Sequence, residues 1–396
     1  MNASRRAPRL HAPLRRAIAA SVLIAGSFAA PEHAGIALDD RKPPQPASGG
    51  RLPLEDSPSE PRPQDDEAHR ALLRGLDYLA VAQKEHQDGS FPLAGGAQHA
   101  PVALAALGAL AFMAEGSTPD RGRYGERVTA AVDYLLSKAD TSASDSRGYL
   151  ALSLEDKWGM HGHGYAVLAL CNAYTLAPRT ERGRRIAELL PDAVRVIEHS
   201  QSAEGGWFYF PVAELKHENS VTVVQLQALR AARNCGIAVD AGVIGKAVDY
   251  IRRCQSENGA FRYALDPTSK TSLALTAAGL ATLQNAGRYS GPEVDRAVHE
   301  IWSAIVERQR RRDADPRAHE SIDFPHYERL YVALALWTHS DRRLFESWFE
   351  PEREHVLRGQ RPDGSWPDDQ FGAAYATAMT CLFLSIDDGL LPLFER

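Results

Sequence analysis

Two kinds of apolar pattern alternate along this chain. Stretches such as residues 68–83 and 292–309 have apolar residues on one helical face and charged residues on the other. Each leads into a stretch that is apolar on nearly every face, and a helix of that kind must be buried. The alternation therefore predicts an all-α fold with an outer and an inner layer of helices. The stretches expected in the inner layer are residues 101–113, 165–176, 220–232, 271–283, 330–337 and 373–384.

A short phrase stands between the outer and the inner stretch of each pair. It starts with Gln and closes with Gly and an aromatic residue, and its clear copies are QKEHQDGSF (83–91), QSAEGGW (201–207), QSENGAF (255–261) and QRPDGSW (360–366). Gln201 and Gln255 are 54 residues apart, and the two longer gaps hold degenerate copies at residues 131–149 and 301–309. A regular period of this order marks a repeat architecture. Six helical hairpins predict a closed (α/α)6 toroid, with an open solenoid as the alternative.

The first 66 residues do not follow this pattern. Residues 1–16 hold five arginines and no acidic residue, and residues 17–30 form a short apolar run with small residues near its end. This layout is typical of a signal peptide, so we expect residues 1–29 to be removed and the protein to be exported to the periplasm or beyond. Residues 30–66 are rich in Pro, Ser and charge, which predicts a disordered linker before a toroid of residues 67–396.

Charge and cysteine usage narrow the range of partners and cross-links. The net charge is −6 even with the basic leader included, which argues against nucleic acid or an anionic membrane surface as an electrostatic partner. The cysteines are Cys171, Cys235, Cys254 and Cys381. Their positions in the expected helices place no two of them within disulfide reach, so we expect buried free thiols.

The repeated phrase resembles the repeat of the prenyltransferase and squalene-hopene cyclase superfamily. Residues 158–174 (WGMHGHGYAVLALCNAY), 219–229 (NSVTVVQLQAL), 276–283 (TAAGLATL) and 390–394 (LLPLF) look like the exported bacterial branch of that superfamily, most of which has no assigned activity. The resemblance implies an α-α toroid with a central cavity that binds an apolar or isoprenoid small molecule. It also leaves open a contact with the membrane for lipid uptake.

The sequence departs from the catalytic motifs of both kinds of enzyme. A protein prenyltransferase would need an Asp-x-Cys pair for zinc, which is absent, and a squalene-hopene cyclase would need Asp-x-Asp-Asp, of which residues 216–220 (KHENS) keep one acid. Three functions therefore remain: binding an isoprenoid with or without transforming it, a non-catalytic ligand-binding or scaffold protein, and a polysaccharide lyase. The lyase would use His163, Tyr327 and Arg329 for β-elimination.

The candidate catalytic residues stand where inner helices are expected to begin, at one shared mouth of the ring. Glu218 is the predicted general acid, because a carboxyl in an apolar cavity has a raised pKa; the alternative is a simple helix-capping acid. His161 and His163 lie two residues apart in a glycine-flanked segment. They are predicted to act in acid–base chemistry or on a common metal, with hydrogen bonds to the loop backbone as the alternative.

The predicted substrate-binding residues are His217, Trp158, Tyr165, Tyr327 and Tyr375. Aromatic faces can stabilise a developing isoprenoid cation, although such rings also serve to pack one hairpin against the next. We assign no cofactor and no metal ion from the sequence. A divalent metal stays open through the paired carboxylates of Asp368 and Asp369.

Overall fold

The computed structural model describes residues 63–93, 100–214, 216–314 and 322–388. The chain divides into two compact units, Met1–Ser59 and Glu60–Arg396, and every described residue belongs to the second. The expected signal peptide and most of the expected linker therefore lie outside the described residues. Helix α2 (Pro63–His86) begins four residues before the toroid boundary that the sequence suggested. No helix in the described part of the chain is long and apolar enough to cross a membrane.

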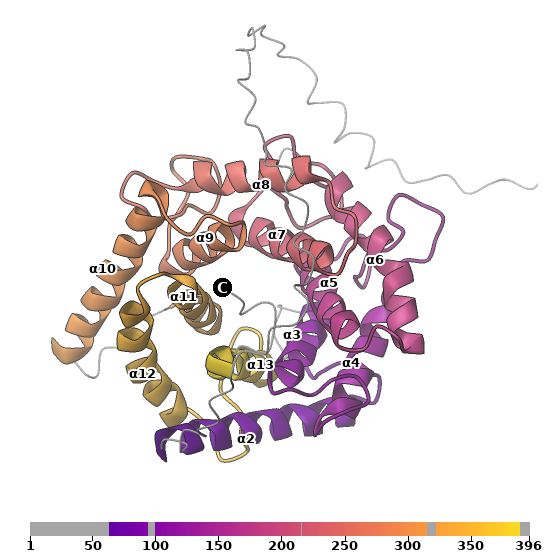
Figure 1. The fold of residues 1–396 in the computed structure, drawn as a ribbon, viewed down its shortest axis with the longest axis horizontal. Coiled ribbons are helices and arrows are strands. Elements are labelled where there is room, and N and C mark those ends of the chain that lie inside the picture. Colours follow the sequence, from indigo (N-terminus) through magenta and orange to yellow (C-terminus); the bar gives the residue numbers. More distant parts are fainter. Residues whose placement is uncertain (1–62, 94–99, 215, 315–321, 389–396) are drawn as a thin grey trace, which may run out of the picture. The chain divides into compact units, whose positions relative to one another are not determined.

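The described residues contain twelve α-helices, which form two concentric layers (Figure 1). The outer layer consists of α2, α4 (Gly125–Ser137), α6 (Glu181–His199), α8 (Ala241–Cys254), α10 (Pro292–Ala314) and α12 (Arg342–Arg358). The inner layer consists of α3 (Pro101–Ala114), α5 (Gly159–Leu176), α7 (Asn219–Asn234), α9 (Leu273–Asn285), α11 (Pro325–Thr338) and α13 (Ala373–Leu384), after which a short 3-10 helix follows at Ile386–Asp388. Every residue of α3 is buried, as its uniformly apolar sequence requires. The predicted (α/α)6 toroid is confirmed.

The glutamine of the repeated phrase ties each hairpin to the next one. Gln201 Nε2 donates to the carbonyl of its own Gly205 at 2.9 Å and to the carbonyl of Val243, in the first turn of α8, at 2.9 Å. The other clear copies make the same pair of bonds: Gln83 with Gly89 and Arg127, Gln255 with Gly259 and Glu293, and Gln360 with Gly364 and Ala71. One side chain thus sets the spacing between successive outer helices.

The glycine and the aromatic residue of the phrase complete this junction. Gly205 has a φ of +94°, and a Cβ at that position would lie 2.3 Å from the carbonyl oxygen of Lys246 in α8. Trp207 is fully buried, and its indole Nε1 donates to Ile197 O in the last turns of α6. Its backbone N–H donates to Thr222 Oγ1 in α7. The phrase therefore joins its own outer helix, its inner helix and the next outer helix.

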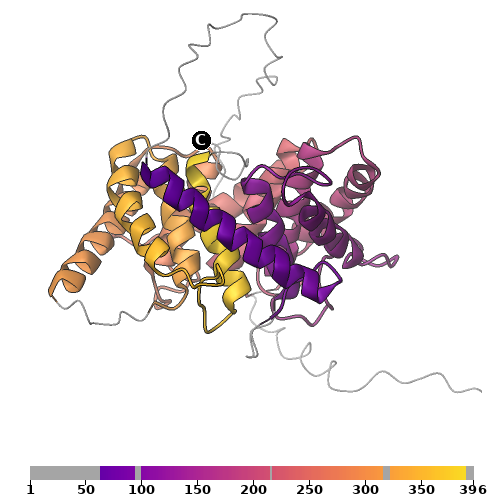
Figure 2. The ribbon, with the colours of Figure 1, turned by 90° about the horizontal axis from the view of Figure 1, so that it is seen from below.

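The last copy of the phrase closes the ring. Gln360, after α12, donates to Ala71 O in α2 at 2.8 Å, across 289 residues of sequence. Gly75 of α2 packs so closely that a Cβ there would meet Cys381 Sγ and the Trp366 ring at 2.8 Å. Figure 2 shows α2 lying across the C-terminal helices in the same way. The first and sixth hairpins are therefore neighbours, which an open solenoid would not allow.

The fifth junction lacks the glycine–aromatic tail and is looser. Gln309, at the end of the degenerate copy, donates to Asp313 within its own helix rather than to α12. A groove of about 550 Å³ opens there between α10, α11 and α12, and its wall includes Trp302 and Trp348. The outer layer therefore has a groove at the one junction where the glycine–aromatic tail is missing.

Ring closure can be tested by comparing two glycines that both have a positive φ. Gly287 (φ +85°) has nothing within 4 Å of its hypothetical Cβ, whereas Gly364 (φ +90°) would place a Cβ 2.3 Å from Arg74 O. We expect Gly287→Ala to lower the free energy of unfolding by about 1 kcal/mol, through backbone strain alone. Gly364→Ala should cost at least about 2 kcal/mol, because α2 must also move. Equal losses in urea denaturation followed by circular dichroism would contradict the proposed closure.

Candidate functional site

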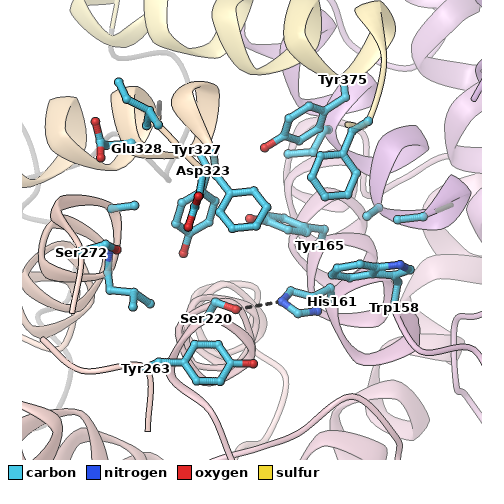
Figure 3. Close-up of a pocket in the computed structure, with 18 of the residues that line it drawn as sticks. Trp158, His161, Tyr165, Ser220, Tyr263, Ser272, Asp323, Tyr327, Glu328 and Tyr375 are labelled. Carbon is cyan, nitrogen blue, oxygen red and sulfur yellow. Dashed lines mark hydrogen bonds between the residues drawn. The ribbon is translucent and has the colours of Figure 1, made fainter. Parts of the chain in front are cut away.

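A cavity of about 380 Å³ lies where the inner helices begin. All six of those helices, or the residues just before them, contribute to its wall, which includes Leu104, Tyr165, Ser220, Leu275, Tyr327 and Tyr375. Figure 3 shows Tyr165, Ser220, Tyr327 and Tyr375 around this space. The starts of the inner helices therefore surround one cavity, as the sequence led us to expect. Most of the lining side chains are aliphatic or aromatic, so the cavity suits an apolar ligand.

Hydrogen bonds between neighbouring loops hold this rim together. The first turn of α5 is tied to the next repeat by Met160 N, which donates to Tyr209 O at 3.1 Å. The first turn of α7 is tied in the same way by Asn219 N, which donates to Tyr263 O at 2.7 Å. The hydroxyls of Tyr209 and Tyr263 are 2.5 Å apart, and the Tyr263 ring reaches the cavity wall.

Glu218 is the N-cap of α7 and is fully buried. Its carboxylate accepts the N–H groups of Ser220 at 2.9 Å and Val221 at 2.5 Å, and the Ser220 hydroxyl at 2.9 Å. Burial raises the pKa of Glu218 to about 7, although the two N–H donors and the hydroxyl act against the shift. The raised pKa makes this carboxyl easier to protonate than an exposed glutamate.

His161 lies beside Glu218 and lines the cavity. Its Nε2 is 3.1 Å from Ser220 Oγ (Figure 3) and 3.8 Å from Glu218 Oε1. An ion pair would raise the pKa of the histidine and lower that of the acid. Burial instead lowers the pKa of His161 to about 4 and raises that of Glu218, so it favours the neutral form of both groups.

Glu218 itself is not among the residues of the cavity wall, whereas Ser220 and His161, which both contact it, are. The chain of polar groups runs from Glu218 through Ser220 Oγ, where it meets His161 and the cavity. Sequence reasoning singled out the two ends of this chain and missed Ser220. The sequence did offer a signal for Ser220, because it lies two residues after Glu218, at the start of the same helix.

The structure places His163 away from the cavity. It is fully buried, with Nδ1 accepting from Leu150 N at 3.1 Å and Nε2 donating to Ala193 O in α6 at 3.0 Å. These bonds replace the ones that Gln201 and Thr222 make in the third repeat. Burial lowers the pKa of His163 to about 4. His163 thus binds the second hairpin to the third and does not share a site with His161.

Two other predicted residues also lie elsewhere. His217 Nδ1 is 3.0 Å from the Tyr250 hydroxyl of α8, and His217 is not among the cavity residues. Arg329 pairs with Glu352 of α12 at 2.8 Å, in the groove between α10 and α12. The three residues expected of a lyase, His163, Tyr327 and Arg329, are therefore not brought together.

The four remaining aromatic predictions, Trp158, Tyr165, Tyr327 and Tyr375, all line the cavity. Trp158 caps α5 and meets Phe371 edge-on, with ring centroids 5.8 Å apart. The Tyr327 hydroxyl is buried without a well-aligned hydrogen bond. Aromatic rings from three inner-helix segments thus face one space.

The wall also contains charged residues that sequence reasoning missed. Lys270 and Asp323 are largely exposed at the cavity edge, with Nζ and Oδ2 3.4 Å apart. Arg308 Nη1 lies 2.7 Å from Glu328 Oε1, and both side chains are mostly buried. The charges at the wall are therefore paired with each other.

The described residues contain no group of three His, Cys, Asp or Glu side chains positioned to hold a metal ion. Asp368, one of the paired carboxylates, accepts the backbone N–H groups of Gln370 and Phe371 through Oδ1. It thereby shapes the turn before α13.

No family model and no curated protein matches this sequence. Solved structures match its fold. The type II terpene cyclase MstE from Scytonema, in complex with geranylgeranyl dihydroxybenzoate, is 15% identical over 82% of this chain and 98% of that chain, with a TM-score of 0.53. The GH76A α-1,6-mannanase from Salegentibacter sp. is 10% identical over 82% and 99%, with a TM-score of 0.57. A protein from Actinoplanes is 15% identical over 80% and 98%, with a TM-score of 0.52.

These matches show a shared α/α toroid and nothing finer. The same architecture holds an isoprenoid substrate in one neighbour and belongs to a carbohydrate-active enzyme in another. The function must therefore be argued from the cavity of this chain.

The buried histidines predict how stability depends on pH. The folded-state pKa values of His161, His163 and His326 are about 4, below the 6.5 of an unfolded chain. The unfolded state therefore takes up protons first, and stability is lost as the pH falls through 6.5 toward 4. Glu218, with its raised pKa, acts in the opposite direction between 4.5 and 7.

His163→Gln should remove one of these contributions. From pH 7 to pH 5 the variant should lose about 2 kcal/mol less of its free energy of unfolding than the unchanged protein. Urea denaturation at both pH values measures this difference, and the same substitution at the exposed His69 is the control. An unchanged pH dependence in His163→Gln would mean that this imidazole is not held neutral.

Proposed function

We propose that this protein binds an apolar, isoprenoid-like molecule in the cavity at the start of its inner helices. The observation that carries the proposal is the wall itself, where Trp158, Tyr165, Tyr327 and Tyr375 face one space beside aliphatic residues of α3 and α9. The volume of about 380 Å³ lies within the range of small-molecule sites.

The distribution of polar groups supports an amphipathic ligand. Lys270 and Asp323 are exposed at the edge, where a polar head group would remain in contact with water. Burial favours the neutral forms of Glu218 and His161, so these two side chains oppose an apolar chain less than fully charged groups would. The apolar part of the ligand then lies against the rings and the head group lies at the edge.

A carbohydrate ligand has weaker support from this cavity. The mannanase shows that the fold suits a carbohydrate-active enzyme. A sugar, however, presents hydroxyl groups that each need a hydrogen-bond partner when buried, and most of this wall is apolar. The separation of His163 and Arg329 from Tyr327 also removes the geometry on which the lyase alternative depended.

The contacts among Glu218, Ser220 and His161 favour proton transfer to the ligand as a second activity of the same site. Burial raises the pKa of Glu218 to about 7, and its carboxyl group is hydrogen-bonded to the hydroxyl of Ser220, which lines the cavity. Ser220 would give its proton to an alkene carbon of the ligand while it takes the proton of Glu218. The cation formed would rest against the aromatic faces until it loses a proton to the neutral His161.

Filling the cavity should abolish binding. Ala103 of α3 lines the wall, and Ala103→Trp would occupy the space that the ligand needs. We expect native mass spectrometry or calorimetry to show geranylgeraniol binding to the unchanged protein and at least about tenfold weaker binding to this variant. Val81→Trp, at a position that is 59% exposed on α2, adds the same side chain as a control and should bind normally. Preference for α-1,6-mannotriose over geranylgeraniol would overturn the proposal.

The proton-transfer step can be tested in D₂O. Protonation of an alkene by Glu218 through Ser220 should leave carbon-bound deuterium in geranylgeraniol, detectable by mass spectrometry. Ser220→Ala and Glu218→Gln should lose incorporation and keep binding, because neither removes an aromatic ring from the wall. Ser272→Ala removes another cavity hydroxyl, at the start of α9, and should retain it. Binding without any deuterium in the unchanged protein would leave the binding function and remove the catalytic one.

A further inference from the structure

Two of the four cysteines meet between α5 and α7. Cys171 lies within α5, and Cys235 is the C-cap residue of α7. The Cys235 Sγ is 3.3 Å from Cys171 O and 3.3 Å from Thr175 Oγ1, so the Cys235 thiol packs directly against Cys171. The sequence placed no two cysteines within disulfide reach, and all four are free thiols in the structure, but Cys235 and Cys171 lie next to each other. The two cysteines are 64 positions apart in the sequence, and the repeat brings these parts of the neighbouring inner helices together.

The other two cysteines have different surroundings. Cys254, at the end of α8, interacts with Tyr250, and Cys381, in α13, faces Leu72 O at 3.9 Å. Both are buried, and so is Cys171, whereas Cys235 is partly exposed. An external reagent can therefore reach one member of the pair, and the second member lies directly behind it.

We propose that Cys171 and Cys235 form an intrachain disulfide that links α5 to α7. The thiolate of Cys235 attacks a small disulfide oxidant such as oxidised glutathione, which forms a mixed disulfide and releases one glutathione thiol. Cys171 then attacks the Cys235 sulfur and releases the second glutathione thiol. The two cysteines lose two protons and two electrons, and the oxidant takes up both.

The roles of the two sulfurs follow from their surroundings. The hydrogen bond from Cys171 lowers the pKa of Cys235 to about 7, with a further contribution from Thr175, while burial opposes the shift. The same contact and burial raise the pKa of Cys171. Cys235 is thus the partly exposed nucleophile with the lowered pKa, and Cys171 is the resolving thiol. Export, which the N-terminal sequence predicts, would place the pair where disulfides persist.

The bond would act on the helices that carry the candidate site. His161 lies near the start of α5 and Ser220 near the start of α7, while the cysteines lie toward the other ends of these two helices. A covalent link there would restrict the sliding of α5 against α7, and with it the 3.1 Å contact between His161 and Ser220. The disulfide itself does not depend on the proposed function.

The experiment compares the full chain before and after oxidation. Reduced protein is treated with oxidised glutathione, its free thiols are alkylated in denaturant, and peptides are mapped by mass spectrometry. We expect two alkylated cysteines instead of four and one cross-linked peptide pair that contains Cys171 and Cys235. The apparent melting temperature should rise by about 5 °C, because closing a loop of this length restricts the unfolded chain.

Three variants make the assignment specific. Cys235→Ser and Cys171→Ser should lose both the cross-link and the rise in melting temperature, whereas Cys254→Ser, at another buried cysteine, should keep both. Peptide mapping of the unchanged protein decides the question alone if a variant fails to fold. Four free thiols after oxidation, or a glutathione adduct on Cys235 that Cys171 never displaces, would overturn the proposal.

Discussion

The pair of hydrogen bonds from each phrase glutamine holds the rest of the molecule in place. The amide nitrogen donates to two carbonyls at once, one in the glycine turn of its own hairpin and one in the next outer helix. A polar group left unpaired in such a junction costs more than a hydrogen bond gains, so the register between hairpins is strongly specified. Since Gln360 reaches back to Ala71, the same interaction that spaces the hairpins also joins the ends of the chain of repeats.

Departures from this junction explain why the ring is not symmetric. The second repeat has no phrase glutamine. There, the two ring nitrogens of His163 form hydrogen bonds with Leu150 N and Ala193 O, and the second of these bonds joins the hairpin to the next outer helix. In the fifth repeat nothing equivalent is seen among the described residues, and Gln309 binds within its own helix next to an open groove. The inner helices nevertheless begin on one rim, because most hairpins are held in the same register. The site therefore depends on the repeat as a whole.

The fold could be predicted from the sequence because the alternation of outer and inner helices recurs in every repeat. Part of the site could be predicted too, because the same alternation shows where the inner helices begin. Trp158, Tyr165, Tyr327 and Tyr375 reach the cavity because they stand at or near inner-helix starts. The two histidines were expected in a loop, but α5 begins at Gly159, six residues earlier than predicted. Residues two apart on a helix lie about 200° around its axis, so His161 faces the cavity and His163 faces the outer layer. The pairing of Cys171 with Cys235 depends on the axial register of two helices, which no local pattern encodes.

The electrostatic state of Glu218 links the stability of the rim to the proposed chemistry. As a helix cap, the carboxylate is stabilised by the Ser220 and Val221 N–H groups, and as an acid it must hold a proton that weakens those bonds. Its pKa near 7 shows the two demands in balance while water can still enter the neighbouring cavity. An apolar ligand that displaces this water would remove solvation from the charged form and raise the pKa further. Ligand binding would then favour the protonated acid, so the proton becomes available to Ser220 when there is a ligand to receive it.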